Sequence, residues 1–308
     1  MTAPSVGDSP TSDRPPRPHR LPPAIRAMRP RQWLKNVLVV AAPLAAGQLF
    51  DPQVLGRDCL AFVAFSLMSA AVYLVNDIRD MAEDQLHPTK RFRPIAAGQL
   101  RVSVAWGLAA VCAVLGFTVG FLTSVPLGIT LAVYLGLQLL YSAFLKHMLI
   151  IDLAMVASGF LLRAVAGGVA TGIELSQWFL LVASFGSLFM VAGKRYSELV
   201  ALGADAGTRR SLERYSVSYL RFAWVISAAT VLMSYSLWAF DNDNRDPGPF
   251  GVPWSALSIA PFTLGMLQYA LRIDRGDAAE PEEIVLRDRM LQVIAVIWLA
   301  LIAVGVFG

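Results

Sequence analysis

The residues best suited to chemistry lie in one short stretch, YLVNDIRDMAEDQLHPTKRFRPIAAG, from Tyr73 to Gly98. After an apolar run, an amide and several acids follow in close succession: Asn76, Asp77, Asp80, Glu83 and Asp84. A helix continued at about 100° per residue places all of these except Glu83 on one flank. Oxygen ligands in this pattern suit Mg²⁺, which proteins bind through one or two carboxylates together with substrate phosphates. We therefore expect a magnesium site here; the alternative is a solvated helix end with stray acids.

A basic run follows the acids and reverses the charge. It contains Lys90, Arg91 and Arg93. Arginine binds phosphate oxygens through paired hydrogen bonds, and lysine acts as a point charge. We expect these cations to hold phosphate, the alternative being the ordinary excess of positive charge on the cytoplasmic side of a membrane protein.

The composition shows which elements must position these residues. Of 308 residues, 56% are hydrophobic and 16% are charged, whereas a soluble domain has about 25% charged residues. The apolar residues form blocks long enough for membrane-spanning helices of ~20 residues. We expect an all-α integral membrane protein with about nine transmembrane helices. The expected spans are residues 36–50, 59–76, 103–123, 126–145, 149–170, 177–193, 218–240, 252–271 and 289–307.

The charge distribution predicts orientation in the lipid bilayer. Residues 1–28 are rich in Pro, Ser and Arg and read as a disordered basic tail ahead of a catalytic domain at 29–308. Nearly all lysines and arginines fall on one side of the expected spans, which predicts a plasma (inner) membrane protein with its N-terminus and active site in the cytoplasm. The net charge of +4 reflects this bias, so it does not indicate nucleic-acid binding.

The acidic stretch carries a family resemblance. NDIRDMAED resembles the N-D-x-x-D-x-x-x-D motif of the UbiA superfamily of intramembrane prenyltransferases, and HPTKRFRPIAAG and RPRQWLKN resemble two further segments of that family. The resemblance implies a bundle of about nine helices and a Mg²⁺-bound diphosphate held by Asn76, Asp77, Asp80 and Asp84. It also implies substrate contacts from Lys35 and Asn36, at the end of RPRQWLKN.

The sequence departs from the family at its second aspartate-rich motif. That segment reads MVAGKRYSELVALG, with Lys194, Arg195 and Glu198 and no D-x-x-x-D. These cations suit a phosphorylated second substrate; the alternative is that they only anchor the helix at the interface. The departure, with segments such as GSLFMVAGKRYSEL, resembles one branch of the superfamily. This branch implies transfer of phosphoribose from phosphoribosyl pyrophosphate to decaprenyl or another polyprenyl phosphate, for cell-wall arabinan precursors.

Other residues inside the spans are weaker candidates. Arg163 is an intramembrane charge, and such charges usually face the bundle interior or a water-filled cavity. It is expected either to reach donor phosphate or to pair with an acid such as Asp152. Tyr141 and Lys146 are expected at the mouth of the same cavity. The small-residue segment AVAGGVATG, residues 164–172, predicts close helix packing, with a close approach to phosphate as the alternative.

Two other functions compete with the phosphoribosyl transfer. An aromatic prenyltransferase has the same fold, but the missing second aspartate motif argues against it. A transporter is a non-enzyme alternative, disfavoured because the acids cluster at one membrane face rather than at mid-depth. Self-association into a homo-oligomer is an expectation that no motif specifies.

Overall fold

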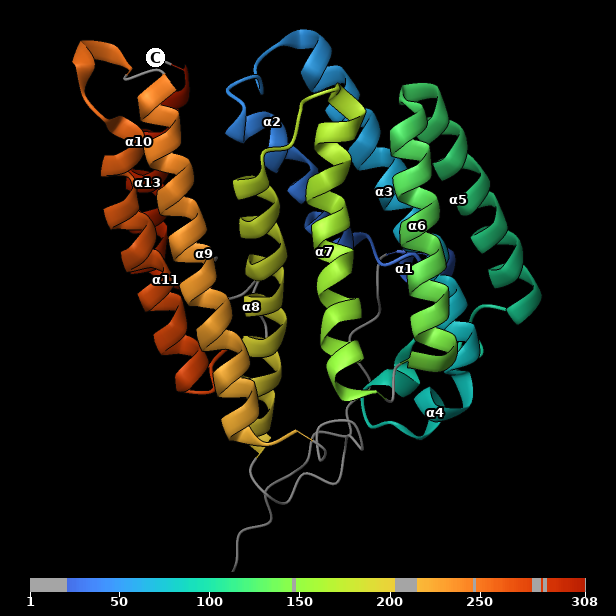
Figure 1. Cartoon of the computed structure of the whole chain (residues 1–308). Coiled ribbons are helices and arrows are strands. Elements are labelled where there is room, and N and C mark those ends of the chain that lie inside the picture. Colours follow the sequence, from blue (N-terminus) through green and yellow to red (C-terminus); the bar gives the residue numbers. More distant parts are fainter. Residues whose placement is uncertain are drawn as a thin grey trace, which may run out of the picture.

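The computed structural model describes residues 21–145, 148–202, 215–245, 248–278, 284 and 287–307. Its regular structure is helical throughout these ranges, in a bundle of long helices that run roughly along one axis (Figure 1). The long helices are α3 (Pro52–Arg79), α5 (Val102–Thr123), α6 (Val125–Leu140), α7 (Leu149–Thr171), α8 (Gln177–Leu202), α9 (Val217–Arg245), α11 (Ile259–Asp274) and α13 (Arg289–Phe307). The all-α fold class is confirmed.

Shorter elements complete the bundle. They are α1 (Pro23–Ala27), the 3₁₀ helix η1 (Pro30–Val40), α2 (Ala41–Ala45), α4 (Met81–Leu86), the 3₁₀ turn η2 (Lys90–Phe92), the π-turn η3 (Tyr141–Leu145), the 3₁₀ turn η4 (Pro249–Gly251) and α10 (Trp254–Leu257). In Figure 1, α4 lies at one end of the bundle, whereas α2 and α10 lie at the other.

Seven helices of the described chain are long and apolar enough to cross a membrane. Two further expected spans are helical but broken. Residues 36–50 fall on η1 and α2, which meet at Ala41, and residues 252–271 fall on α10 and α11, which are separated at Ser258. The count of nine continuous spans is therefore not confirmed, although each expected span contains helix.

The helix boundaries follow from local side-chain chemistry. Asp51 caps α3 by accepting hydrogen bonds from the backbone N–H groups of Gln53 and Val54, at 2.8 and 3.1 Å. Ser124 caps α6 by accepting from the N–H of Leu127 at 3.1 Å. These side chains satisfy amides that have no partner inside the helix. They fix where two neighbouring spans begin.

The small-residue segment of α7 packs closely against η1, as predicted. A Cβ atom added at Gly167 would lie 1.7 Å from the carbonyl oxygen of Val39. Only glycine permits the two backbones to approach this far. The closeness brings η1 against α7, with Val39 and Ala166 both fully buried in one core.

The ordered domain begins before Arg29. The expected disordered tail ends at residue 28, but Pro23–Ala27 forms α1 and Ala27 is fully buried in a core with Leu74 and Ile95. Burial of this apolar face stabilises the short helix, because isolated helices of this length are marginal in water. Residues 1–20 of the expected tail lie outside the described residues.

Candidate active site

The acidic residues lie where α3 passes into α4. The expected helix through Asp84 is interrupted at Asp80, whose backbone leaves helical geometry at φ −89° and ψ 7°. Hydrogen bonds nevertheless continue across the break, from Asp80 N to Asn76 O at 2.9 Å and from Asp84 N to Asp80 O at 2.8 Å. The acids therefore stay near one another despite the interruption, much as the helical spacing predicts.

Two of these carboxylates are buried and share a guanidinium. Asp77 and Asp84 are each 2% exposed. Arg93 donates from Nη1 to Asp77 Oδ1 at 3.2 Å and to Asp84 Oδ2 at 2.6 Å. Lys90 Nζ lies 3.9 Å from Asp84 Oδ1. Because like charges this close repel, the shared cation is what allows both acids to remain buried.

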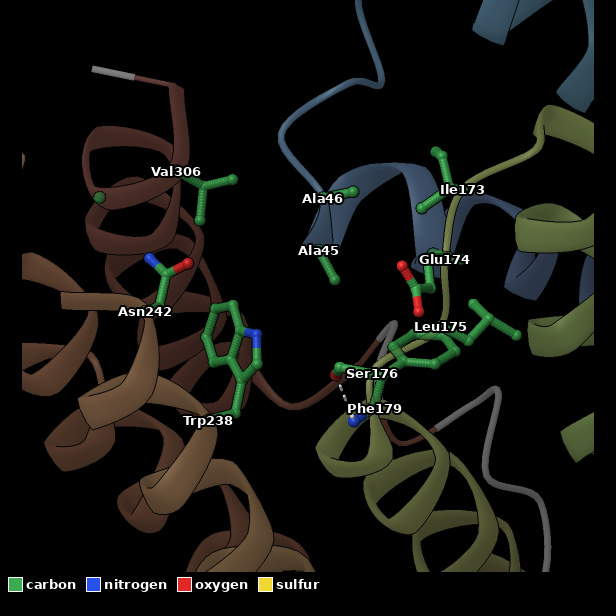
Figure 2. A pocket seen from close by; sticks show the side chains of 12 residues that line it. Ala45, Ala46, Ile173, Glu174, Leu175, Ser176, Phe179, Trp238, Asn242 and Val306 are labelled. Carbon is green, nitrogen blue, oxygen red and sulfur yellow. Dashed lines mark hydrogen bonds between the residues drawn. The ribbon is translucent and has the colours of Figure 1, made fainter. Parts of the chain in front are cut away.

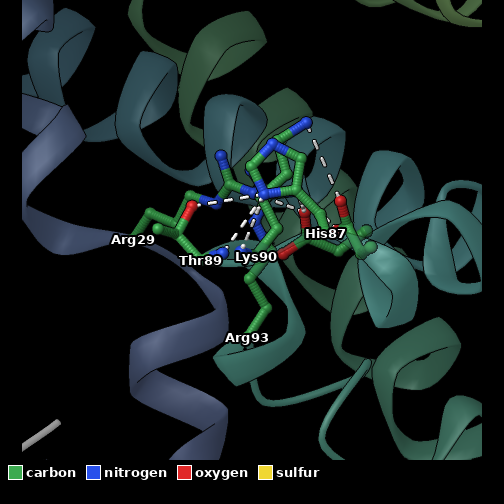
Figure 3. Close-up of polar contacts among 7 residues, drawn as sticks. Arg29, His87, Thr89, Lys90 and Arg93 are labelled. Atoms are coloured by element: carbon green, nitrogen blue, oxygen red, sulfur yellow. Dashed lines mark hydrogen bonds and ion pairs between the residues drawn. The ribbon is translucent and has the colours of Figure 1, made fainter. Parts of the chain in front are cut away.

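Arg29 is a second cation on Asp77 that sequence reasoning missed. Its guanidinium pairs with Asp77 Oδ1 and lies 5.0 Å above the ring of Tyr73. Its backbone is left-handed, at φ 55° and ψ 61°, which is costly for a residue with a Cβ atom. Figure 3 shows Arg29 meeting Lys90 and Arg93, which come from a second segment at η2. We define the aspartate site as Arg29, Asn76, Asp77, Asp84, Lys90 and Arg93.

The aspartate site fits a metal ion that takes some of its ligands from the protein and the others from a bound substrate. The Oδ1 atom of Asn76 is buried and has no hydrogen-bond partner in the described structure. This oxygen and the carboxylates of Asp77 and Asp84 are hard ligands of the kind that Mg²⁺ takes. Within the described ranges, no three acidic, His or Cys side chains already form a metal cluster. The residues present therefore suit a cation that arrives with phosphate oxygens.

A second polar cluster lies at the start of α7. Asp152 is 3% exposed. Its carboxylate accepts hydrogen bonds from Tyr141 at 2.6 Å, from Arg195 at 3.1 Å and from Tyr215 at 3.4 Å. These four residues join η3, α7, α8 and the segment before α9, and we call them the Asp152 cluster. Burial, together with the charge of Asp152, raises the pKa of Tyr215.

The cations of α8 occupy different environments. Arg195 is fixed by Asp152, and its side chain is only 17% exposed. Lys194 is 43% exposed, and its Nζ lies 3.9 Å from Glu198 Oε1. Arg195 also reaches Glu198, at 3.9 Å. The segment thus offers one anchored guanidinium and one accessible ammonium group, with a single acid between them.

Arg163 lies deeper and contacts neutral groups. It donates to Asn36 Oδ1 at 2.7 Å, to Ser69 Oγ and Tyr134 Oη at 3.1 Å each, and to the carbonyl of Gly159. The alternative that pairs it with Asp152 is wrong, because Asp152 binds Arg195 instead. Ser69 precedes Asp77 by eight residues on α3, which is about 12 Å along a helix. The guanidinium therefore lies about that far inside the bundle from the acids.

The other predicted site residues divide between these regions. Asn36 is fully buried, and its amide donates to Ser66 Oγ at 3.0 Å. The Nζ of Lys35 lies 5.9 Å from the centre of the Phe160 ring. Arg91 is exposed and stacks on the ring of Phe92. Asp80 is partly exposed beside the aspartate site, and Lys146 lies outside the described residues.

The geometry defines what the site can bind. Buried acids, an unpartnered amide oxygen and two guanidinium groups meet at one end of the bundle. The Asp152 cluster lies at the start of α7, which Figure 1 places at the same end. Such a surface suits a divalent cation with a diphosphate and, beside it, a second anionic group.

Comparison with known proteins finds that this chain is similar to transferases. A model of the UbiA prenyltransferase family matches residues 37–293. A decaprenyl-phosphate phosphoribosyltransferase from Corynebacterium glutamicum is 51% identical over 290 residues, which cover 92% of this chain and 86% of that protein. One from Mycobacterium tuberculosis (strain H37Rv) is 50% identical, covering 92% of this chain and 94% of that protein.

Solved structures agree on the fold. A UbiA homologue from Archaeoglobus fulgidus, solved with GPP and Mg²⁺, matches with a TM-score of 0.66 at 17% identity. The match covers 92% of this chain and 99% of that one. The same homologue solved with DMAPP and Mg²⁺ gives a TM-score of 0.67. At this identity the likeness concerns the arrangement of helices.

Proposed function

Because the chain belongs to the UbiA prenyltransferase family, we propose that it is a transferase that moves 5-phosphoribose from phosphoribosyl pyrophosphate to decaprenyl phosphate, releasing pyrophosphate. The observation that carries the proposal is the basic pair Lys194 and Arg195, at the place where an aspartate-rich motif is expected. The relatives at about 50% identity carry the matching name over nearly the whole chain.

The donor belongs at the aspartate site. Asn76, Asp77 and Asp84 would hold Mg²⁺, with Asp80 beside them. The metal supplies charge neutralisation for the departing pyrophosphate. Arg29 and Arg93 already lie on the same carboxylates and are suited to bind phosphate oxygens in pairs. The main role of these residues is to stabilise the negative charge that develops on the leaving pyrophosphate.

The acceptor belongs beside the Asp152 cluster. A polyprenyl phosphate oxygen is already anionic at neutral pH, so the attack needs no strong general base. That oxygen forms a bond to C1 of ribose, while the bond from C1 to the pyrophosphate oxygen breaks and its electron pair leaves with pyrophosphate. Lys194 and Arg195 hold the acceptor phosphate, with Asp152 fixing the guanidinium of Arg195. Lys35 is a further cation for either substrate.

A second candidate shares the fold. The A. fulgidus homologue was solved with GPP and with DMAPP, so transfer of a prenyl group to an aromatic acceptor is the alternative. Two cations on α8 add little to the binding of a neutral aromatic acceptor, whereas they directly strengthen the binding of an anionic acceptor. We therefore rank the phosphoribosyl transfer first.

A paired turnover assay tests the proposal on purified protein with Mg²⁺. One reaction contains labelled phosphoribosyl pyrophosphate and decaprenyl phosphate; the other contains labelled prenyl diphosphate and 4-hydroxybenzoate. We expect lipid-extractable sugar label in the first reaction and no prenylated aromatic product in the second. Product only in the second reaction would make the chain an aromatic prenyltransferase.

The membrane placement extends the proposal. We infer that the aspartate site faces the cytoplasm of a bacterial plasma membrane, because the basic segments lie at that end. A single cysteine introduced at exposed Ala97, with Cys59 and Cys112 replaced, should resist a membrane-impermeant maleimide in intact cells. One at exposed Gln177 should react, and the reverse pattern would invert the topology. We also propose that the protein self-associates into a homo-oligomer; light scattering that gives a monomer mass would exclude it.

A further inference from the structure

A cavity of about 270 Å³ lies at the end of the bundle away from the aspartate site. Its walls come from α2, from the connection between α7 and α8, and from the ends of α9 and α13 (Figure 2). None of its lining residues belongs to the aspartate site or to the Asp152 cluster. The proposed transfer therefore leaves this cavity without a role.

Two hydrogen-bond acceptors, the side chains of Glu174 and Asn242, line the cavity, together with the hydroxyl of Ser176 and the indole N–H of Trp238. Glu174 is exposed, and Figure 2 shows its carboxylate directed across the cavity toward Trp238. Among the described residues no cation pairs with Glu174. Asn242 donates its amide N–H to Ser255 Oγ at 2.9 Å, which leaves its amide oxygen for the cavity side. Trp238 and Phe179 add two aromatic side chains to the lining.

The helix ends add negative potential. The helices α2, α9 and α13 end at Ala45, Arg245 and Phe307, and residues near each of these ends line the cavity. The carbonyl end of a helix carries a partial negative charge that favours cations. The opposite effect comes from α8, which begins at Gln177. One amide of its first turn is already occupied, since Phe179 N donates to Ser176 Oγ at 3.1 Å.

We propose that this cavity binds a primary ammonium group. A carboxylate, an amide oxygen and carbonyl ends match the three N–H donors of such a group. The aromatic side chains favour an organic cation over a hydrated metal ion. Two alanines of α2, Ala42 and Ala45, and Ala46 just after it leave little oxygen for metal coordination. At the membrane boundary the source is either the ethanolamine headgroup of a lipid or a free amine. Both present the same chemistry.

A purely local role for Glu174 is the competing explanation. Its carboxylate precedes α8 by three residues and could serve only to complement the positive end of that helix. That role predicts an effect of Glu174 on stability and none on ligand binding. The two explanations therefore separate in a binding measurement.

The test uses the full chain purified in detergent. Lipid retention is compared by native mass spectrometry for phosphatidylethanolamine and phosphatidylglycerol, in the wild type and in the variants Glu174→Gln and Trp238→Leu. Asp51→Asn is the matched control, because it removes an acid near the same end while asparagine still caps α3. We expect at least tenfold preference for phosphatidylethanolamine in the wild type and in Asp51→Asn. We expect parity in Glu174→Gln and about fivefold weaker retention of phosphatidylethanolamine in Trp238→Leu.

A second arm identifies the source of the ammonium group. Free ethanolamine at millimolar concentration should raise the Tm of the wild type and not that of Glu174→Gln, whereas tetramethylammonium should have no effect on either. Stabilisation by ethanolamine without lipid preference assigns the site to a free amine; lipid preference alone assigns it to a headgroup. If Glu174→Gln changes neither lipid retention nor the ethanolamine response, the proposal is wrong. Phosphoribosyl transfer should stay within twofold in all variants.

Discussion

At the residue scale, the main feature is that buried acids are held by cations that the proposed donor would also need. Arg93 bridges Asp77 and Asp84, and Arg29 pairs with Asp77. Breaking a buried ion pair from one side costs about 3–5 kcal/mol, because the remaining charge is uncompensated. A bound Mg²⁺ and diphosphate satisfy acids and guanidinium groups together. Binding of donor and metal should therefore be mutually dependent.

The first prediction concerns the acids. Asp77→Asn and Asp84→Asn should each lower turnover more than 100-fold, because each removes a charged oxygen ligand for the donor's metal. Turnover is measured with labelled phosphoribosyl pyrophosphate, and Mn²⁺ binding in the presence of donor is followed by electron paramagnetic resonance. Glu83→Gln is the control, since Glu83 is an exposed acid of the same segment, and it should stay within threefold. Normal Mn²⁺ binding by Asp77→Asn would exclude the metal site.

The second prediction concerns the cations of α8. Lys194→Gln and Arg195→Gln should raise the KM for polyprenyl phosphate about tenfold or more and leave the KM for the donor within threefold. The reason is that a charge-assisted hydrogen bond to phosphate contributes about 1.5–3 kcal/mol. Arg101→Gln, an exposed cation after the HPTKRFRPIAAG segment, serves as the control. If only the KM for the donor rises, these residues bind phosphoribosyl pyrophosphate and not the polyprenyl phosphate.

Sequence reasoning found the residues that are close along the chain and missed those brought together by folding. The spacing of Asp77 and Asp84 predicts their common flank, because helix geometry relates near neighbours. Arg29 is 48 residues away from Asp77, and no periodic rule connects residues at that separation. Tyr215 was missed for the same reason, because it meets Asp152 only through the packing of α9 on α8 and of α8 on α7. The only sequence signal for Arg29 is that it is a cation close to the start of the first apolar block.

At the element scale, Arg163 joins four segments of the bundle. Its hydrogen bonds reach η1 through Asn36, α3 through Ser69, α6 through Tyr134 and its own helix α7 through Gly159. Its guanidinium also lies 5.0 Å from the centre of the Tyr134 ring. We therefore propose that Arg163 holds the segments behind the aspartate site in register.

The third prediction tests this role. Arg163→Met should destabilise the protein by about 2–4 kcal/mol, because it leaves several buried polar groups without partners. Thermal unfolding in detergent measures the loss, and Arg163→Lys should fall between the variant and the wild type since lysine keeps the charge without the fork of donors. An unchanged Tm with a raised KM for the donor would instead make Arg163 a substrate residue.

The fourth prediction concerns the start of α13. Asp288 accepts hydrogen bonds from Gln268, from the N–H of Leu291 and from Arg272, and these contacts lower the pKa of Asp288 from 3.8 to about 2. A lowered pKa in the folded state means stability that is present above pH ~4 and is lost as the pH falls through about 2. The loss should weaken the attachment of α13 to α11.

Asp288→Asn measures this contribution, since asparagine keeps a capping oxygen and removes the charge. We expect a Tm about 2 °C below the wild type at pH 6, because an ion pair near the surface contributes roughly 0.5–1 kcal/mol. The difference should vanish as the pH approaches 2. A difference that persists unchanged at pH 2 would show that the charge of Asp288 is not its cause.

Element boundaries were predictable where the apolar run was long and lacked proline. The expected span at 149–170 corresponds closely to α7, Leu149–Thr171. The spans at 36–50 and 252–271 contain Pro43 and Pro261, which cannot donate a backbone hydrogen bond. Both regions are broken helices in the structure. Hydropathy reports the apolar block, whereas the breaks depend on backbone hydrogen bonding that hydropathy does not measure.

At the scale of the whole molecule, chemistry is concentrated at one end of an apolar bundle. The aspartate site and the Asp152 cluster lie at the end marked by α4, and the proposed ammonium cavity lies at the other. A lipid-linked acceptor suits this arrangement, because its phosphate can meet the polar end while its chain stays in the bilayer. Sequence composition alone predicts the membrane bundle. The pairing of two polar clusters depends on how α3, α7 and α8 pack.

The most direct measurement follows two labels in one reaction. Phosphoribosyl pyrophosphate is labelled with ¹⁴C in the ribose and ³²P in the β-phosphate, and is incubated with purified protein, Mg²⁺ and decaprenyl phosphate. We predict that ¹⁴C enters the lipid phase while an equal amount of ³²P appears in water as pyrophosphate. With the Asp77→Asn variant, no ¹⁴C should enter the lipid phase and no labelled pyrophosphate should form. If ¹⁴C stays in water while ³²P enters the lipid, or if neither label moves with the wild type, the proposed phosphoribosyl transfer is contradicted.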